Sequence, residues 1–177
     1  MRLAPVLLSL MTLAAPGFAR AADPPTIILE SRLRHEAVDQ SGLPNTASAL
    51  TLRTRLGFET APWKGVQLLI EGENVVALGE EYNSTTNGKT IYPIVPDPET
   101  TELNRLQLTW KGDKTAAVVG RQRIILGSAR FVGNVGFRQN EQTFDAARLD
   151  FKPRPDLALT YAYVDRVQRV FGDDHPQ

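Results

Sequence analysis

The sequence predicts an all-β protein, an antiparallel up-and-down transmembrane β-barrel of which about seven strands are present. Apolar and polar residues alternate over segments of about ten residues, the length that a tilted strand needs to cross an outer membrane. Arg recurs at alternate positions in these segments, as at Arg53 and Arg55 or Arg121 and Arg123. A sheet with Arg on one face and apolar side chains on the other fits a water-filled lumen surrounded by lipid better than a soluble core.

The N-terminus has the pattern of a secretory signal peptide, which we expect to span residues 1–22. Arg2 precedes an apolar run over residues 3–15, and small residues follow around Arg20. The apolar run is shorter than the ~20 residues that a membrane-spanning helix needs. We therefore expect an exported chain in the cell outer membrane, with residues 23–177 forming the N-terminal part of a barrel.

Three strands are predicted in the first half of the chain. Residues 26–38 alternate charged side chains with apolar or small ones. Residues 49–60 alternate most regularly and set Arg53 and Arg55 opposite a face of Leu and Phe. Residues 66–78 follow with a weaker alternation. Side chains two apart on a strand share a face, so each segment has one polar and one apolar face.

Four more strands are predicted in the second half, at residues 102–111, 114–123, 142–152 and 156–167. The strand at 114–123 puts Arg121 and Arg123 on the same face as Val119. We expect Arg148, from the neighbouring strand of the hairpin, to join them on that face.

The predicted connections alternate in length. Long polar connections at 39–48, 79–101 and 124–141 alternate with short ones at 61–65, 111–114 and 152–156. Short periplasmic turns and long external loops are typical of bacterial outer-membrane barrels. Because a compact domain does not need a structureless connection as long as 79–101, we expect that segment to have a function.

Two features predict that the chain is part of a larger barrel. An odd strand count differs from the even counts of bacterial single-chain barrels, and an open edge would leave backbone groups unpaired in lipid. Residues 171–177 also form a polar end.

Composition argues against several classes of function. The formal net charge is zero and there is no Cys, so neither nucleic-acid binding nor a thiol or disulfide site is indicated. The carboxylate pairs Glu71 with Glu73 and Glu141 with Asp145 resemble a glycosidase pair only weakly. We expect no enzyme, cofactor or metal site, and we interpret Asp97 as a solvated acid rather than a Ca²⁺ ligand.

The Arg residues of the strands have two compatible interpretations. They form either a surface that selects anions or cross-strand pairs with Glu59, Glu71, Glu73, Asp145 and Asp150 that stiffen the wall. The Arg residues in question are Arg53, Arg55, Arg105, Arg121, Arg123 and Arg148. A soluble periplasmic carbohydrate-binding β-protein remains the alternative to a channel.

Several long phrases of the sequence resemble the alginate-export-like family of bacterial outer-membrane porins. These phrases are GRQRI at 120–124, NVGFRQNEQTFDAARLDF at 134–151, ALTLRTRLGFET at 49–60, and EGENVVALGEEYNSTTNGKTIYPIVPDPETTELNR at 71–105. The resemblance implies a large monomeric barrel whose Arg-lined constriction passes anionic solutes, including acidic polysaccharide. The expected partners are then outer-membrane lipid, the barrel-assembly machinery and the anionic solute.

The resemblance also implies roles for particular residues. Arg121, Arg123, Arg130 and Arg138 would belong to the basic lumen wall or to a loop that plugs it. Gln139, Asn140 and Glu141 would order the corner where the loop enters the next strand. With the strand residues above, the expected solute path comprises Arg53, Arg55, Arg105, Arg121, Arg123, Arg130, Arg138 and Arg148.

Overall fold

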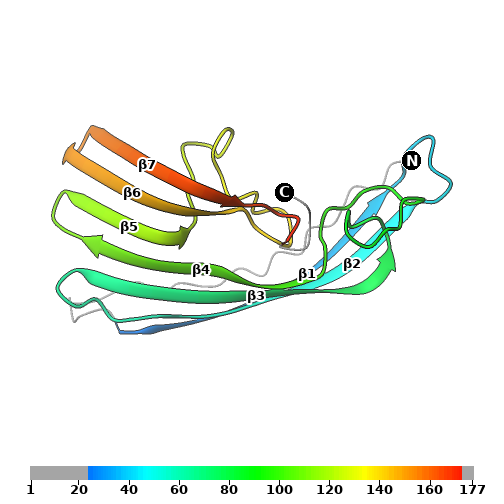
Figure 1. Cartoon of the computed structure of the whole chain (residues 1–177), viewed down its shortest axis with the longest axis horizontal. Helices are drawn as coiled ribbons and strands as arrows, with labels where there is room; N and C mark the ends of the chain where they lie inside the picture. Colours follow the sequence, from blue (N-terminus) through cyan, green and yellow to red (C-terminus); the bar gives the residue numbers. More distant parts are fainter. Residues whose placement is uncertain (1–23, 173–177) are drawn as a thin grey trace.

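A computed structural model describes residues 24–172 of the chain, and within them seven antiparallel strands form one sheet (Figure 1). Each strand pairs with its neighbours in sequence, and β1 and β7 do not pair with each other in this part of the chain, so the sheet is unclosed. The strands are β1 (Thr26–Val38), β2 (Ala47–Glu59), β3 (Val66–Glu81), β4 (Thr100–Lys111), β5 (Thr115–Gln122), β6 (Thr143–Arg154) and β7 (Leu157–Gln168). The predicted signal peptide lies outside the described residues.

The predicted all-β, up-and-down fold is confirmed, and the strands lie where the alternation placed them. The main difference is the hairpin of β2 and β3, which extends further than predicted at its open end, to the pair Ser48 and Glu81. The pairing shifts register between Leu50 and Thr51, so Leu78 has no direct partner. This bulge interrupts the period of two, which is why the alternation stopped at residue 78.

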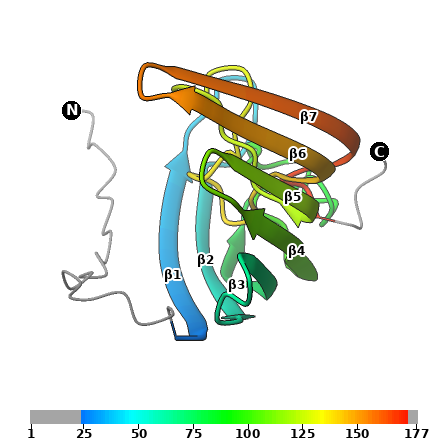
Figure 2. The ribbon, with the colours of Figure 1, turned by 90° about the vertical axis from the view of Figure 1, so that its left-hand side faces the viewer.

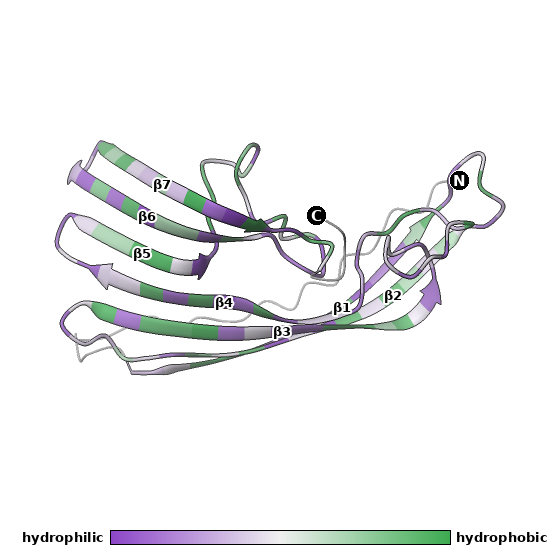
Figure 3. Ribbon diagram, viewed as in Figure 1, coloured by the Kyte–Doolittle hydropathy of each residue, from purple (hydrophilic) through white to green (hydrophobic). Residues whose placement is uncertain are grey.

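The sheet is curved (Figure 2), and hydrophilic and hydrophobic residues alternate along its strands (Figure 3). Because successive side chains of a strand project from opposite faces, the two faces differ in chemistry. We call the inner side, toward which Arg53 and Arg55 project, the concave face, and the other side the convex face. Residues directly opposite on antiparallel strands project from the same face. The convex face carries large apolar side chains that remain 43% to 63% exposed, among them Leu56, Leu68, Leu108, Val119 and Leu149.

Two long connections, residues 82–99 and 123–142, pack against the concave face. In the first, Val95 and Tyr82 form a small buried cluster with Ala47 and Ala49 of β2. In the second, Ile124 packs against Phe144 and Ala146 of β6. The apolar core is therefore divided into two small clusters, each between a connection and the sheet.

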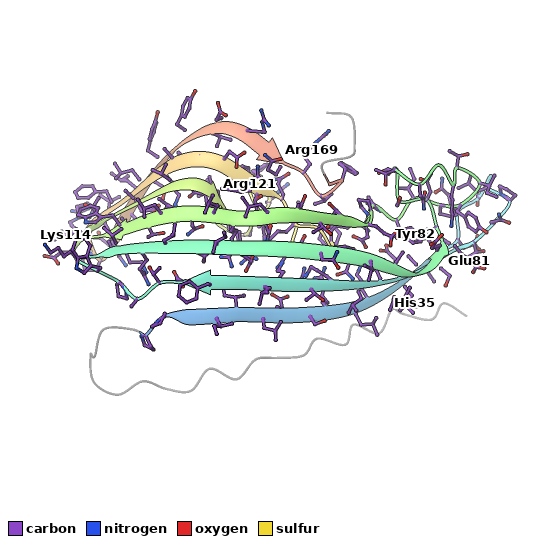
Figure 4. The ribbon with its side chains drawn as sticks, turned by 60° about the horizontal axis from the view of Figure 1, so that its bottom comes forward. His35, Glu81, Tyr82, Lys114, Arg121 and Arg169 are labelled. Atoms are coloured by element: carbon purple, nitrogen blue, oxygen red, sulfur yellow. The ribbon has the colours of Figure 1, made fainter. Side chains whose placement is uncertain are left out.

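Short and long connections lie at opposite ends of the sheet, as the sequence predicts. Lys114, in a short connection, lies far from Glu81 and Tyr82, which mark the start of the long connection between β3 and β4 (Figure 4). No helix within residues 24–172 is long and apolar enough to cross a membrane.

The strand register is staggered across the sheet. Ile27, near the start of β1, belongs to a row of directly opposed residues that ends at Arg166, near the end of β7. The intervening members of the row are Phe58, Ile70, Leu106, Arg121 and Asp145. Because β1 starts at the end with short connections and β7 ends at the other, the strands are tilted, as in the wall of a barrel.

Gly120 provides a test of the β4–β5 pairing. It has a φ of +111°, and an added Cβ would lie 2.2 Å from the carbonyl oxygen of Leu106. We expect Gly120→Ala to lower the free energy of unfolding by roughly 1–3 kcal/mol, the cost of one strained backbone conformation. The measurement is the urea midpoint of unfolding in detergent, and the control is Gly72→Ala, where the nearest atom is 3.7 Å away. Equal midpoints for the two variants would contradict the pairing.

Candidate functional site

A cluster of Arg and Glu residues lies on the concave face in the middle of the sheet. Arg53 and Arg55 come from β2, and Glu71 and Glu73 come from β3, and each is at most 4% exposed. Because these residues alternate along their strands, they project from one face, and the register sets Arg55 directly opposite Glu73. The alternation visible in the sequence therefore generates a buried ionic layer.

Each carboxylate of the layer is bound by a guanidinium. Arg105 of β4 holds Glu71 with two hydrogen bonds, from Nε to Oε1 at 2.9 Å and from Nη2 to Oε2 at 2.6 Å. The Nε of Arg55 donates to Oε2 of Glu73. Paired, planar contacts of this kind are among the strongest hydrogen bonds in proteins.

Glu141 brings the connection 123–142 into the same layer. Both oxygens of its carboxylate accept a hydrogen bond from Nε of Arg123, each at 2.7 Å. The Nη2 of Arg55 lies 3.3 Å from Oε1 of Glu141. The amide groups of Asn104 and Asn134 donate to it at 2.7 and 2.8 Å. Asn104 has no direct partner in the β3–β4 register, because a bulge lies between the pairs Glu71–Arg105 and Gly72–Leu103. The bulge turns the side chain of Asn104 inward, toward the site.

Glu141 lies outside the strands, and its protonation is set by these contacts. Burial raises the pKa of its carboxyl, but the hydrogen bond from Arg123, the charges of Arg55 and Arg123 and the hydrogen bond from Asn104 together lower that pKa to about 2. Glu141 is therefore a carboxylate at any physiological pH.

The segment 136–140 then crosses the concave face to β1 and β2. Gln139 is fully buried, and its Nε2 donates to Oγ1 of Thr51 at 2.8 Å. Its Oε1 accepts from Nε of Arg32 at 2.9 Å, and Arg32 also donates to the carbonyl oxygen of Gly136 at 2.9 Å. The Nη1 of Arg53 donates to the carbonyl oxygen of Gln139 at 3.2 Å. Arg side chains of the wall thus bind the backbone of an inward-folded connection.

The structure brings together half of the Arg residues expected along the solute path, namely Arg53, Arg55, Arg105 and Arg123. The others have their side-chain partners elsewhere, although Nη1 of Arg148 donates to the carbonyl oxygen of Arg123 at 3.3 Å. Arg138 pairs with Glu36 at 3.1 Å, and Arg148 pairs with Asp150 at 2.9 Å. Arg130 is exposed, with its guanidinium 5.3 Å from the ring centre of Phe131.

The prediction that Arg121 shares a face with Arg123 and Arg148 is wrong. Arg121 is opposite Leu106 and Asp145 and therefore lies on the convex face, whereas Arg148 is opposite Val118, on the concave face. The Nε and Nη2 of Arg121 donate to the carboxylate of Asp145 at 2.8 and 3.1 Å. The expectation failed because β5 ends at Gln122, so the strand alternation does not extend to Arg123.

Sequence reasoning missed several residues that hold the connection. The inward positions of Arg32 and Arg34 follow from the alternation of 26–38, but their partners are distant in sequence. Asn104 had no signal, because a bulge is not visible in the residue pattern. Asp97 was expected to be a solvated acid and is instead buried, at 1% exposed.

The carboxylates of the two weak glycosidase-like pairs have Arg partners or lie apart. Glu71, Glu73 and Glu141 each contact Arg, and Asp145 lies on the convex face, away from Glu141. Within residues 24–172 no group of three His, Cys, Asp or Glu residues could hold a metal ion.

The antiparallel sheet has a counterpart among solved structures. The chain is similar in structure to part of OccD3. The crystal structure of Pseudomonas aeruginosa OccD3 (OpdP), an outer-membrane porin, matches with a TM-score of 0.55 at 15% sequence identity. The match covers 81% of this chain and 29% of OccD3, so the chain spans less than a third of the length of that protein.

The likeness to OccD3 shows a porin-like fold. No protein-family model matches the sequence, and no curated protein matches it.

Glu141 provides a test of the ionic layer. Glu141→Gln keeps the shape of the side chain but leaves Arg55 and Arg123 with one carboxylate fewer. Because breaking a buried ion pair leaves an uncompensated charge, we expect a loss of ~3–5 kcal/mol in unfolding free energy, measured by urea titration in detergent. Glu80→Gln is the control, since Glu80 is exposed and its pair with Lys89 should contribute little. Similar effects of the two substitutions would mean that the layer is not stabilising.

Proposed function

We propose that the chain forms part of the wall of an outer-membrane channel through which anionic solutes pass passively. The observation that carries the proposal is the inverted distribution of side chains: charged groups are buried on the concave face, and large apolar groups are exposed on the convex face. Soluble proteins rarely expose an apolar surface of this extent to water, whereas the outer surface of a barrel in lipid is apolar. The porin-like fold supports the same conclusion.

The aromatic residues support a membrane location. Trp63, Trp110 and Tyr161 are exposed and lie in or near the short connections. Amphipathic rings at one end of a strand layer suit the interface between lipid and water. The soluble periplasmic alternative is disfavoured, because it would leave the convex face in water. Outer-membrane lipid and the barrel-assembly machinery are therefore the partners we propose.

The solute path that we propose is narrower than the full set of Arg residues. Arg53 and Arg55 are buried and neutralised, so they hold the wall rather than meet the solute. Arg123 and Arg148 have side chains that are 27% and 26% exposed, and Arg130 is exposed. We propose that an anion meets these three residues.

The anionic solute that we favour carries carboxylates, as an acidic polysaccharide of the alginate type does. The guanidinium group offers a planar pair of donors that matches a carboxylate. The resemblance of the phrases at 71–105 and 134–151 to alginate-export-like porins supports this substrate class, and the likeness to OccD3 supports a channel without identifying its solute.

The convex face can be tested with a matched pair of substitutions. Leu108 lies on the convex face and is 50% exposed, and its neighbour Gln107 projects to the concave face, opposite Gly120. A basic side chain facing lipid costs roughly 2–4 kcal/mol near the midplane, so Leu108→Arg should reduce the amount of protein assembled in outer membranes. Gln107→Arg should assemble normally. Equal recovery of both variants in the detergent-extracted membrane fraction would contradict a lipid-facing side.

Selectivity can be tested on the complete channel that contains this wall. We expect Arg130→Gln combined with Arg148→Gln to shift the reversal potential toward cations at ~0.1 M salt, where charges act over about 10 Å. The control is Arg121→Gln, because Arg121 lies on the convex face. An unchanged reversal potential in the folded double variant would refute the role of these residues in anion passage.

A further inference from the structure

The two connections on the concave face meet where Asn140 donates to the carbonyl oxygen of Pro98 and, beside it, at the carboxylate of Asp97. Its Oδ1 accepts a hydrogen bond from the backbone nitrogen of Gln139 at 2.9 Å, so residues 82–99 contact residues 123–142 directly. Its Oδ2 is paired with Arg34 of β1 and lies 3.9 Å from Nη1 of Arg138. Asp97, which belongs to the connection 82–99, therefore contacts both the connection 123–142 and strand β1.

The Asp97 side of this junction is attached firmly to the sheet. Val95 is fully buried against Ala47 and Ala49, and its backbone nitrogen donates to the carbonyl oxygen of Asn83 at 2.9 Å. The hydroxyl of Tyr82 donates to the carbonyl oxygen of Asp97 itself at 3.0 Å. Asp97 is thus presented from a segment with its own apolar anchor.

The segment that Asp97 holds has less apolar support. Residues 136–141 are held mainly by polar contacts, such as that of Gln139 with Thr51 and that of Asn140 with the carbonyl oxygen of Pro98, at 3.1 Å. Val135, just before the segment, has a φ of 51°, which is costly for a β-branched residue. Such a conformation persists only when the surroundings hold it.

We infer that Asp97 is the positioning residue that holds residues 136–141 of the connection 123–142 across the concave face. Through this contact the two connections act as one inner layer, and the cross-section open to solute depends on Asp97. The consequence for conduction rests on the proposed function, whereas the position of the connection does not.

A buried cysteine reports on the position of the connection, because the chain has no cysteine of its own. Thr51 is 1% exposed and is bound by Gln139, so Thr51→Cys should react slowly with a water-soluble maleimide in outer-membrane fractions. Adding Asp97→Ala should raise that rate at least about tenfold, which corresponds to ~1.4 kcal/mol of docking free energy. Asp97→Asn, which can still accept from Gln139 but cannot pair with Arg34, should give a smaller rise and serves if Asp97→Ala does not assemble.

Two controls separate release of the connection from general unfolding. Asp113→Asn, in an exposed short connection, should leave the labelling of Thr51→Cys unchanged. A second reporter, Val118→Cys, is 4% exposed on β5 and should stay slow in the Asp97 variants. An unchanged rate at Thr51→Cys, or an equal rise at both reporters, would overturn the inference. The labelling rate does not depend on ion flow. A protein that conducts no ions would therefore refute the proposed function, but the labelling rates would still test the role of Asp97.

Discussion

Charge neutralisation inside a poorly hydrated wall is the constraint on which the rest of this structure depends. A buried guanidinium or carboxylate is tolerated only when a partner of opposite charge and further hydrogen bonds surround it. Arg53 and Arg55 of β2 therefore require Glu73 of β3, and Glu71 requires Arg105 of β4. These pairs link neighbouring strands on the concave face, while the opposite face is left to apolar side chains.

The same constraint explains why a connection folds inward. From the strands Arg123 has Glu71 of β3 at 3.5 Å, and the hydrogen bonds that Arg32 donates go to the connection, to Gln139 and Gly136. Residues 136–141 supply partners, with backbone carbonyl oxygens for Arg32 and the carboxylate of Glu141 for Arg55 and Arg123. An inward connection is therefore a counterpart of the charged concave face. The ionic contacts that stabilise the sheet therefore also fix the position of the connection.

Much of the fold could be predicted from local pattern, and much of the site could not. Alternation placed the strands and put Arg53, Arg55 and Arg105 on the inner face, because a period of two is a property of the strand itself. It failed at Arg121 and Arg123, where the strand ends between the two residues. It also gave no indication of Asn104 or Asp97, whose roles depend on a bulge and on partners more than 30 residues away.

The sequence by itself determined the antiparallel strands, the alternation of short and long connections, and the supply of Arg and Glu on one face. These properties are local, since each depends on residues within one strand or one hairpin. Only the tertiary structure decided which of the Arg residues are neutralised, that Arg121 faces outward, and that the connections 82–99 and 123–142 meet at Asp97. Those outcomes depend on register and on sheet curvature, which bring residues from distant strands into contact and which no single segment encodes.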